Sequence, residues 1–149
     1  MESFAGLPAP TEKLPAVLLV DDDEQDAALV KRAFERAGLQ CPFVRVASGL
    51  EAMAYLSGQP PYQDEIRFPH VGLVLLDIRM PGIDGFEVLR WIRHNPILLG
   101  LPIVVLTSSD EIHDANKAYL LGATSFFVKP FDFANYAAFS RTIQLFIKC

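Results

Sequence analysis

The chain has 149 residues, of which 51% are hydrophobic, and this composition suits one domain with a sizeable core rather than a disordered chain. Its net charge of -5 and its scattered Lys and Arg residues argue against a nucleic-acid surface, since phosphate backbones require clustered positive charge. No window reaches the roughly 18 apolar residues of a membrane span, and residues 1–14 lack the apolar run of a signal peptide. We therefore expect a soluble, cytoplasmic protein with no membrane contact, a flexible tail at residues 1–14 and one domain at residues 15–149.

Apolar runs and helical periodicities alternate along the rest of the chain. The apolar, β-branched-rich runs predict strands at residues 16–20, 43–46, 73–76, 103–106 and 125–128. The periodic stretches between them predict five helices, one ending at Gly38, one starting after Ser48, and three at about residues 85–94, 110–122 and 132–149. Residues 57–70 are polar and rich in Pro, which predicts a surface loop that is long for a compact domain.

This alternation predicts an α/β fold. Parallel strands joined by helices form a sheet that is covered on both faces, and right-handed crossovers leave few topologies. We expect a flavodoxin-like, doubly wound sheet of five strands in the order 2-1-3-4-5, with five helices. Its ligand crevice should lie at the carboxyl ends of the strands, between the first and third.

Polar residues follow the strands at this edge of the sheet. Asp21 and Asp22 follow the first strand, Asp77 the third, Thr107 the fourth and Lys129 the fifth. Three neighbouring carboxylates repel one another unless a cation joins them, and Mg²⁺ is a hard cation that prefers oxygen ligands. A metal ion, an ammonium group and a hydroxyl around one carboxylate suit a developing phosphoryl dianion. Asp77 could then be the nucleophile that forms an aspartyl phosphate.

Other polar residues near these strands have simpler interpretations. We expect Asp23 to cap the following helix, and Asp84 to be a turn or cap residue rather than a ligand. His70, His94 and His113 show no partner pattern and are expected at the surface. Cys41 and Cys149 lie in no zinc-binding spacing; two distant thiols fit a reducing cytosol, although the sequence leaves a disulfide bridge open.

From about Pro15 to its end, the chain resembles the receiver domain of two-component response regulators, the family of the chemotaxis receiver. Four motifs carry the resemblance in the family's order and spacing: VDDD at 20–23, LLDIRMPGIDG at 75–85, LTSSD at 106–110 and FFVKPF at 126–131. The resemblance implies that Asp77 accepts the phosphoryl group and that Asp21 and Asp22 form the acidic pair, with Asp22 a direct Mg²⁺ ligand. The main-chain carbonyl of Arg79 would be a further ligand.

The resemblance also implies a switch. Thr107 would bind the phosphoryl oxygen beside the small Ser108, and Lys129 would form an ion pair, with a cis Lys129–Pro130 bond. Phe126 stands where the family keeps a switch aromatic, often Tyr; a Phe can move inward when Thr107 moves but lacks the hydroxyl's hydrogen bonds.

The implied function is that of a stand-alone receiver, a phosphoacceptor rather than a turnover enzyme, phosphorylated by a histidine kinase. Residues 57–70 and the last helix resemble single-domain regulators that partner phytochrome-type kinases. Output would pass through protein contacts, including a homodimer through the face formed by the predicted fourth helix, fifth strand and fifth helix. Apolar residues off the core face of the last helix, such as Leu145, favour such a dimer but also occur as ordinary surface.

Three other functions are less favoured by the sequence. A small phosphohydrolase of the haloacid-dehalogenase type would need an Asp at position 79, which is Arg79. A flavin-binding electron carrier would need a hydroxyl- or Gly-rich phosphate loop where Asp21, Asp22 and Asp23 stand. A receiver-like binding module that is never phosphorylated would keep the same residues.

Overall fold

A computed structural model describes residues 14–107, 112–129 and 136–149. The described strands are β1 (Ala16–Val20), β2 (Phe43–Val46), β3 (Val71–Asp77), β4 (Ile103–Thr107) and β5 (Ser125–Val128). The described helices are α1 (Glu24–Arg36), α2 (Gly49–Leu56), α3 (Gly85–Arg93), the short 3-10 helix η2 (Pro96–Leu98), α4 (Ile112–Leu120) and α5 (Tyr136–Phe146). Within these ranges, no helix is both long and apolar enough to cross a bilayer.

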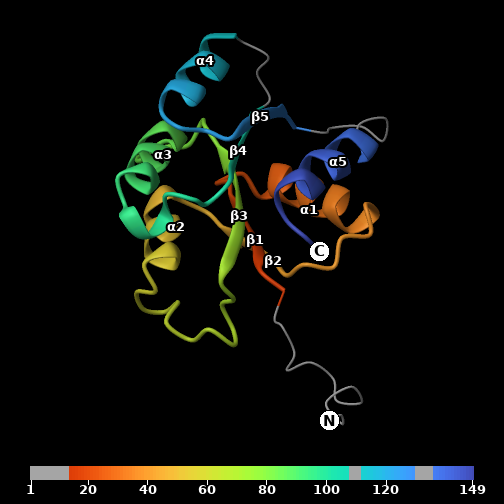
Figure 1. Ribbon diagram of the computed structural model, residues 1–149, viewed down its shortest axis with the longest axis horizontal. Helices are drawn as coiled ribbons and strands as arrows, with labels where there is room; N and C mark the ends of the chain where they lie inside the picture. Colours follow the sequence, from red (N-terminus) through yellow and green to blue (C-terminus); the bar gives the residue numbers. More distant parts are fainter. Residues whose placement is uncertain (1–13, 108–111, 130–135) are drawn as a thin grey trace, which may run out of the picture.

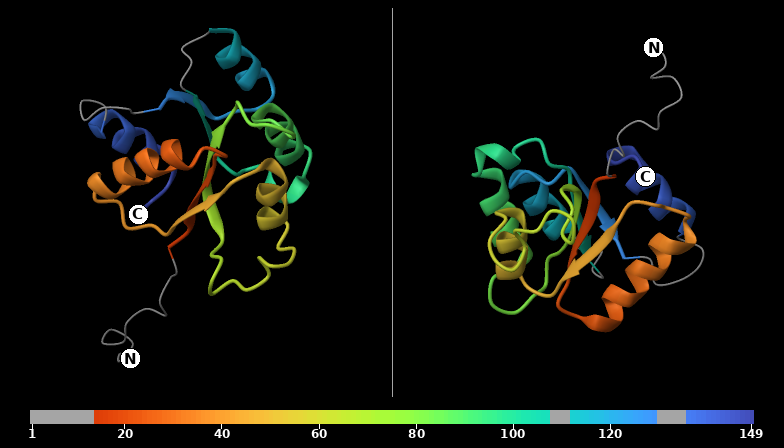
Figure 2. Two further views of the ribbon diagram at one scale, coloured as in Figure 1. Left: turned by 180° about the vertical axis from the view of Figure 1, so that it is seen from behind. Right: turned by 90° about the horizontal axis from the view of Figure 1, so that it is seen from below.

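The strands form one parallel sheet in the order β2-β1-β3-β4-β5, which confirms the flavodoxin-like prediction. Helices α1 and α5 cover one face, and α2 and α3 cover the other (Figure 1). Two further views show the same layers from behind and from below (Figure 2).

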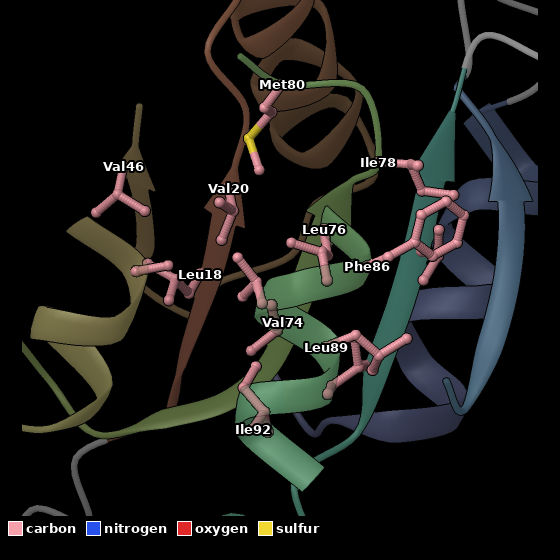
Figure 3. Packing of buried hydrophobic residues seen from close by; sticks show 14 of the residues in the cluster. Leu18, Val20, Val46, Val74, Leu76, Ile78, Met80, Phe86, Leu89 and Ile92 are labelled. Carbon is pink, nitrogen blue, oxygen red and sulfur yellow. The ribbon is translucent and has the colours of Figure 1, made fainter. Parts of the chain in front are cut away.

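Side chains alternate between the two faces along each central strand. Leu18 and Leu76 point to the side of the sheet that α2 and α3 cover, where they share a buried cluster with Leu89 of α3 (Figure 3). Leu19 and Leu75 belong to the opposite cluster, with residues of α1 and α5. All these side chains are fully buried, so β1 and β3 form a rigid base for the residues that follow them.

The element boundaries differ from the predicted ones by a few residues. Strand β3 begins at Val71 rather than residue 73 and includes Asp77. Helix α4 ends at Leu120, two residues before Gly122, whose φ of 106° suits a residue without a side chain. The predicted starts of the last two helices lie outside the described residues, as do the Lys129–Pro130 bond, Ser108 and nearly all of the predicted N-terminal tail.

The loop before β3 is more ordered than its polar sequence indicates. Tyr62 and Phe68 pack with Tyr55 of α2, with ring centroids 5.0 to 5.9 Å apart. The Tyr55 hydroxyl donates a hydrogen bond to the carbonyl of Pro69 at 2.8 Å. The loop is therefore a packed cover over one end of α2, at the end of the sheet opposite Asp77.

The two cysteines form a disulfide, which the sequence left open as the alternative to two free thiols. Cys41 lies between α1 and β2, and Cys149 lies beyond α5. The two cysteines are 108 positions apart and gave no sequence signal, because α5 packs against α1 only in the folded domain. The bridge joins the end of α5 to the turn after α1.

Candidate functional site

The three acids lie together at the carboxyl end of the sheet. Val20 of β1 pairs with Leu76 of β3, so Asp21 and Asp77 follow neighbouring positions. Asp21, Asp22 and Asp77 each offer a carboxylate oxygen, and these atoms all lie within 4.8 Å of one another. Asp21 and Asp77 are buried, whereas Asp22 is exposed. The sequence-based expectation that one ion could be shared by all three is met by this geometry.

Local packing explains why the chain turns sharply after Asp77. The N–H of Gly85 donates to the carbonyl of Ile78 at 2.9 Å, which brings the start of α3 against the end of β3. A Cβ on Gly85 would lie 2.7 Å from the Cα of Ile78, too close for a side chain. Asp84 caps α3 by accepting a hydrogen bond from the N–H of Glu87, as predicted.

Lys129 joins the acids from the fifth strand. Its buried Nζ lies 2.9 Å from Asp21 Oδ2, 3.0 Å from Asp26 Oδ2 and 3.5 Å from Asp77 Oδ1. Asp26 was missed in the sequence, where it reads as an ordinary acid in the first turn of α1. A signal was available, since Asp23 caps α1 as predicted and thereby places the first turn of that helix beside the strand ends.

Burial and charge shift the pKa values of two of these groups. Burial, together with the neighbouring charges of Asp21 and Asp22, raises the pKa of Asp77 to about 6, although Lys129 opposes the rise. Burial alone lowers the pKa of Lys129, but its contacts with Asp21, Asp77 and Asp26 outweigh this effect and raise it. Lys129 is therefore charged at neutral pH, and Asp77 is ionised but poorly compensated.

The donor set fits a hard divalent cation. Asp21 already accepts hydrogen bonds on both oxygens, from Lys129 at 2.9 Å and from the N–H of Asp23 at 3.0 Å. Asp22 is exposed, and burial raises the pKa of Asp77 by more than the nearby Lys129 lowers it, so the ionised form of Asp77 lacks full stabilisation. A cation held by carboxylate oxygens would supply the missing positive charge.

The remaining predicted site residues lie around this cluster. Thr107 ends β4 and is buried, and its carbonyl accepts a hydrogen bond from the N–H of Lys129 at 2.9 Å. Phe126 is partly buried beside Val105 and packs on the α3 side of the sheet. Arg79 lies two residues after Asp77, and its side chain contacts Asp114 of α4, which the sequence did not reveal. The three His residues are exposed, as expected.

The chain is similar to known regulators over most of its length. It is 35% identical over 113 residues to "Response regulator Rcp1" of Synechocystis sp., an alignment that covers 76% of this chain and 75% of that protein. The structure of the Mn²⁺-bound form of Rcp1 matches with a TM-score of 0.74 at 32% identity, over 89% of this chain and 93% of the other.

A phosphorylated relative is similar in structure. The phosphorylated cyanobacterial phytochrome response regulator RcpA matches with a TM-score of 0.77 at 30% identity, over 90% of this chain and 94% of the other. The family model described as "Response regulator receiver domain" matches residues 17–139. Together with the parallel sheet and the acids at its carboxyl edge, these matches show that the chain belongs to the response regulator receiver domain family.

Proposed function

We propose that residues 15–149 form a receiver that takes a phosphoryl group from a phosphohistidine of a histidine kinase onto Asp77. The observation that carries this proposal is the buried Asp77 carboxylate, which lies among Asp21, Asp22 and Lys129. A carboxylate oxygen of Asp77 attacks phosphorus, a phosphorus–oxygen bond forms, and the bond from phosphorus to the imidazole nitrogen breaks. The chain itself is the acceptor, so we do not assign it turnover of an external substrate.

Each neighbouring residue has a separate role in this transfer. Asp21, Asp22, Asp77 and the main-chain carbonyl of Arg79 would hold Mg²⁺, which offsets negative charge on the phosphoryl oxygens. Lys129 is held in place by its contacts to Asp21 and Asp26, so its ammonium group faces Asp77 without further ordering.

Thr107 and Phe126 form the proposed switch. The Thr107 hydroxyl binds a phosphoryl oxygen, and Phe126 moves further inward as Thr107 shifts. Phe126 already packs partly against the α3 side of the sheet, and its ring has no hydroxyl to define a second position. The rotamer of Phe126 is therefore set by packing alone.

Phosphorylation by a small donor tests the site directly. Acetyl phosphate with Mg²⁺ should add one acid-labile phosphate, which intact-protein mass spectrometry detects. Asp77→Asn should abolish the adduct, whereas Asp84→Asn should retain it, because Asn caps α3 equally well. Label that persists in Asp77→Asn would refute the assignment, and no label in the wild type would favour an unphosphorylated binding module.

We further propose a homodimer through α4, β5 and α5. Exposed apolar side chains support this face: Tyr119 and Leu120 on α4, Val128 on β5 and Leu145 on α5, the last 76% exposed. Light scattering after size exclusion, with Mg²⁺ and beryllofluoride, should show a dimer that Leu145→Lys weakens. Leu50→Lys, at a 66% exposed position on α2, is the matched control and should leave assembly unchanged. Equal effects of the two variants would exclude this face.

For the upstream partner we propose a phytochrome-type histidine kinase inside the cell. The support is similarity to RcpA, named as a phytochrome response regulator, and to AtBRR, named as a bacteriophytochrome response regulator. We propose no nucleic-acid or membrane contact, given the net charge of -5. We expect such a kinase to transfer its phosphoryl group to this chain much faster than an unrelated histidine kinase does. Equal rates would reject the pairing.

A further inference from the structure

The attachment of α4 to the rest of the domain is unusual for a helix beside a hydrophobic core. Among its residues 113–120, only Asp114 and Ala118 are buried. Ala118 offers one methyl group to the core, and the other buried side chain is a carboxylate. An apolar anchor of ordinary size is therefore lacking in this part of α4.

The carboxylate of Asp114 is compensated by the loop that follows the proposed phosphorylation site. A single guanidinium nitrogen of Arg79 lies 2.9 Å from Asp114 Oδ2 and 3.2 Å from Oδ1. The Arg79 side chain is 64% exposed, whereas that of Asp114 is 9% exposed. The positive charge of Arg79 thus offsets part of the free-energy cost of burying the Asp114 carboxylate.

The two ends of α4 are held differently. At its carboxyl end, Arg93 of α3 donates from Nε to the carbonyl of Gly122 at 2.8 Å, which fixes the turn into β5. At its amino end, the Arg79–Asp114 ion pair joins the helix to the loop after β3. α4 projects at one edge of the molecule (Figures 1 and 2), so a change at its amino end moves an exposed surface.

We propose that Arg79 is a positioning residue that couples the phosphorylation site directly to α4. This inference rests on the proposed function, in which the main-chain carbonyl of Arg79 is a cation ligand. Filling the site fixes the Arg79 backbone, and the fixed backbone restricts the guanidinium that holds Asp114. Phosphorylation then tightens the amino end of α4 through a connection separate from Thr107 and Phe126. The bound ligand and α4 then both restrict the Arg79 side chain. Two sites are coupled when each of them acts on the same group.

Hydrogen exchange along α4, measured by mass spectrometry with and without Mg²⁺ and beryllofluoride, tests the coupling. In the wild type, ligand should slow exchange of the α4 amides at least about fivefold, the lower end of typical coupling between sites. Arg79→Ala should reduce this effect to less than about twofold, and Asp114→Asn should do the same from the other side of the pair. Arg79→Lys keeps the positive charge and should restore part of it.

A control variant separates coupling from simple loosening of the helix. Lys117, also on α4, lies with its Nζ 4.3 Å from the centre of the Phe86 ring, a contact outside the site loop. Lys117→Ala should speed exchange by the same factor with and without ligand, leaving the ligand effect intact. If Arg79→Ala behaves like Lys117→Ala, Arg79 is only a structural contact and the coupling is refuted.

The outcomes also separate this inference from the proposed function. Beryllofluoride binding to each variant is followed independently by fluorine NMR. If the wild type binds no beryllofluoride, the phosphoacceptor proposal fails and the coupling fails with it. If the wild type and Arg79→Ala both bind it and both slow α4 exchange equally, only the coupling is overturned. Because Arg79 is largely exposed, its replacement by Ala is expected to leave the fold intact even where Asp114→Asn does not.

Discussion

Replacing Asp77 by Asn should stabilise the folded domain when divalent cations are removed, and the gain should depend on pH. The pKa of Asp77 is raised from 3.8 to about 6, mainly by burial. A carboxyl with a raised folded-state pKa binds its proton more tightly in the folded state. Its stabilising contribution is complete below pH 3.8 and is lost as the pH rises through about 6.

The size of the effect follows from the two pKa values. The difference between 3.8 and about 6 corresponds to about 3 kcal/mol at pH 8. Asn loses the attraction to Lys129, but Lys129 keeps its contacts to Asp21 and Asp26. We therefore expect Asp77→Asn to gain about 1–3 kcal/mol over the wild type at pH 8, and about zero near pH 4.

Urea unfolding in EDTA at pH 4.5, 6 and 8 measures this difference. Other acids titrate in both proteins, so the difference between variant and wild type isolates position 77. Asp64→Asn, in the loop before β3, controls for removal of a carboxylate, and its amide oxygen can still accept from the N–H of Ile66. A difference that stays constant with pH, or a variant less stable at pH 8, would refute the account of Asp77 as a poorly compensated buried acid.

Three other measurements test the remaining contacts. Mg²⁺ at ten times its Kd should stabilise the wild type by about 1.4 kcal/mol, a rise in Tm of a few degrees that EDTA reverses and Asp22→Asn reduces; no shift at millimolar Mg²⁺ would count against the cation site. Lys129→Met should cost about 3–5 kcal/mol in urea unfolding, because Asp21 loses its buried partner; a loss below about 1 kcal/mol would contradict this. Dithiothreitol should lower the urea midpoint by opening the Cys41–Cys149 bridge, whose sequence separation of 108 sets an upper limit of about 5 kcal/mol on its stabilisation of the fold. The midpoint of Cys149→Ser should not respond to dithiothreitol. Equal responses of the two proteins would exclude the bridge.

The sheet and the acidic cluster could be predicted because both leave local signals. Each strand is a short apolar run, and the residue after it lies at the carboxyl edge of a parallel sheet, independent of the length and conformation of the loops. Asp21 and Asp77 were therefore placed correctly without coordinates. The cap roles of Asp23 and Asp84 were equally local, since a cap binds N–H groups two or three residues away.

The contacts that were missed join residues far apart in the chain. Asp26 and Lys129 are separated by 103 positions, and Arg79 and Asp114 by 35. Each of these residues has an ordinary local reading, as a first-turn acid or a solvated cation, which hides its partner. Such pairs become visible only when the fold brings these helices and loops together at one edge of the sheet.

Burial of large apolar side chains next to the acids explains how the domain tolerates several carboxylates close together. Ionised Asp77 costs about 3 kcal/mol, comparable with the gain of about 1.5–3 kcal/mol from burying one large aliphatic side chain. Directly before the acids, β1 and β3 bury Leu18, Leu19, Leu75 and Leu76 completely. These four residues together outweigh the cost severalfold, so the strand ends can hold carboxylates close together without distorting the sheet. Residues 113–120 of α4 bury only Asp114 and Ala118, so this part of the helix gains little from apolar burial. A change in charge at the site should therefore leave the sheet in place and act on the helix.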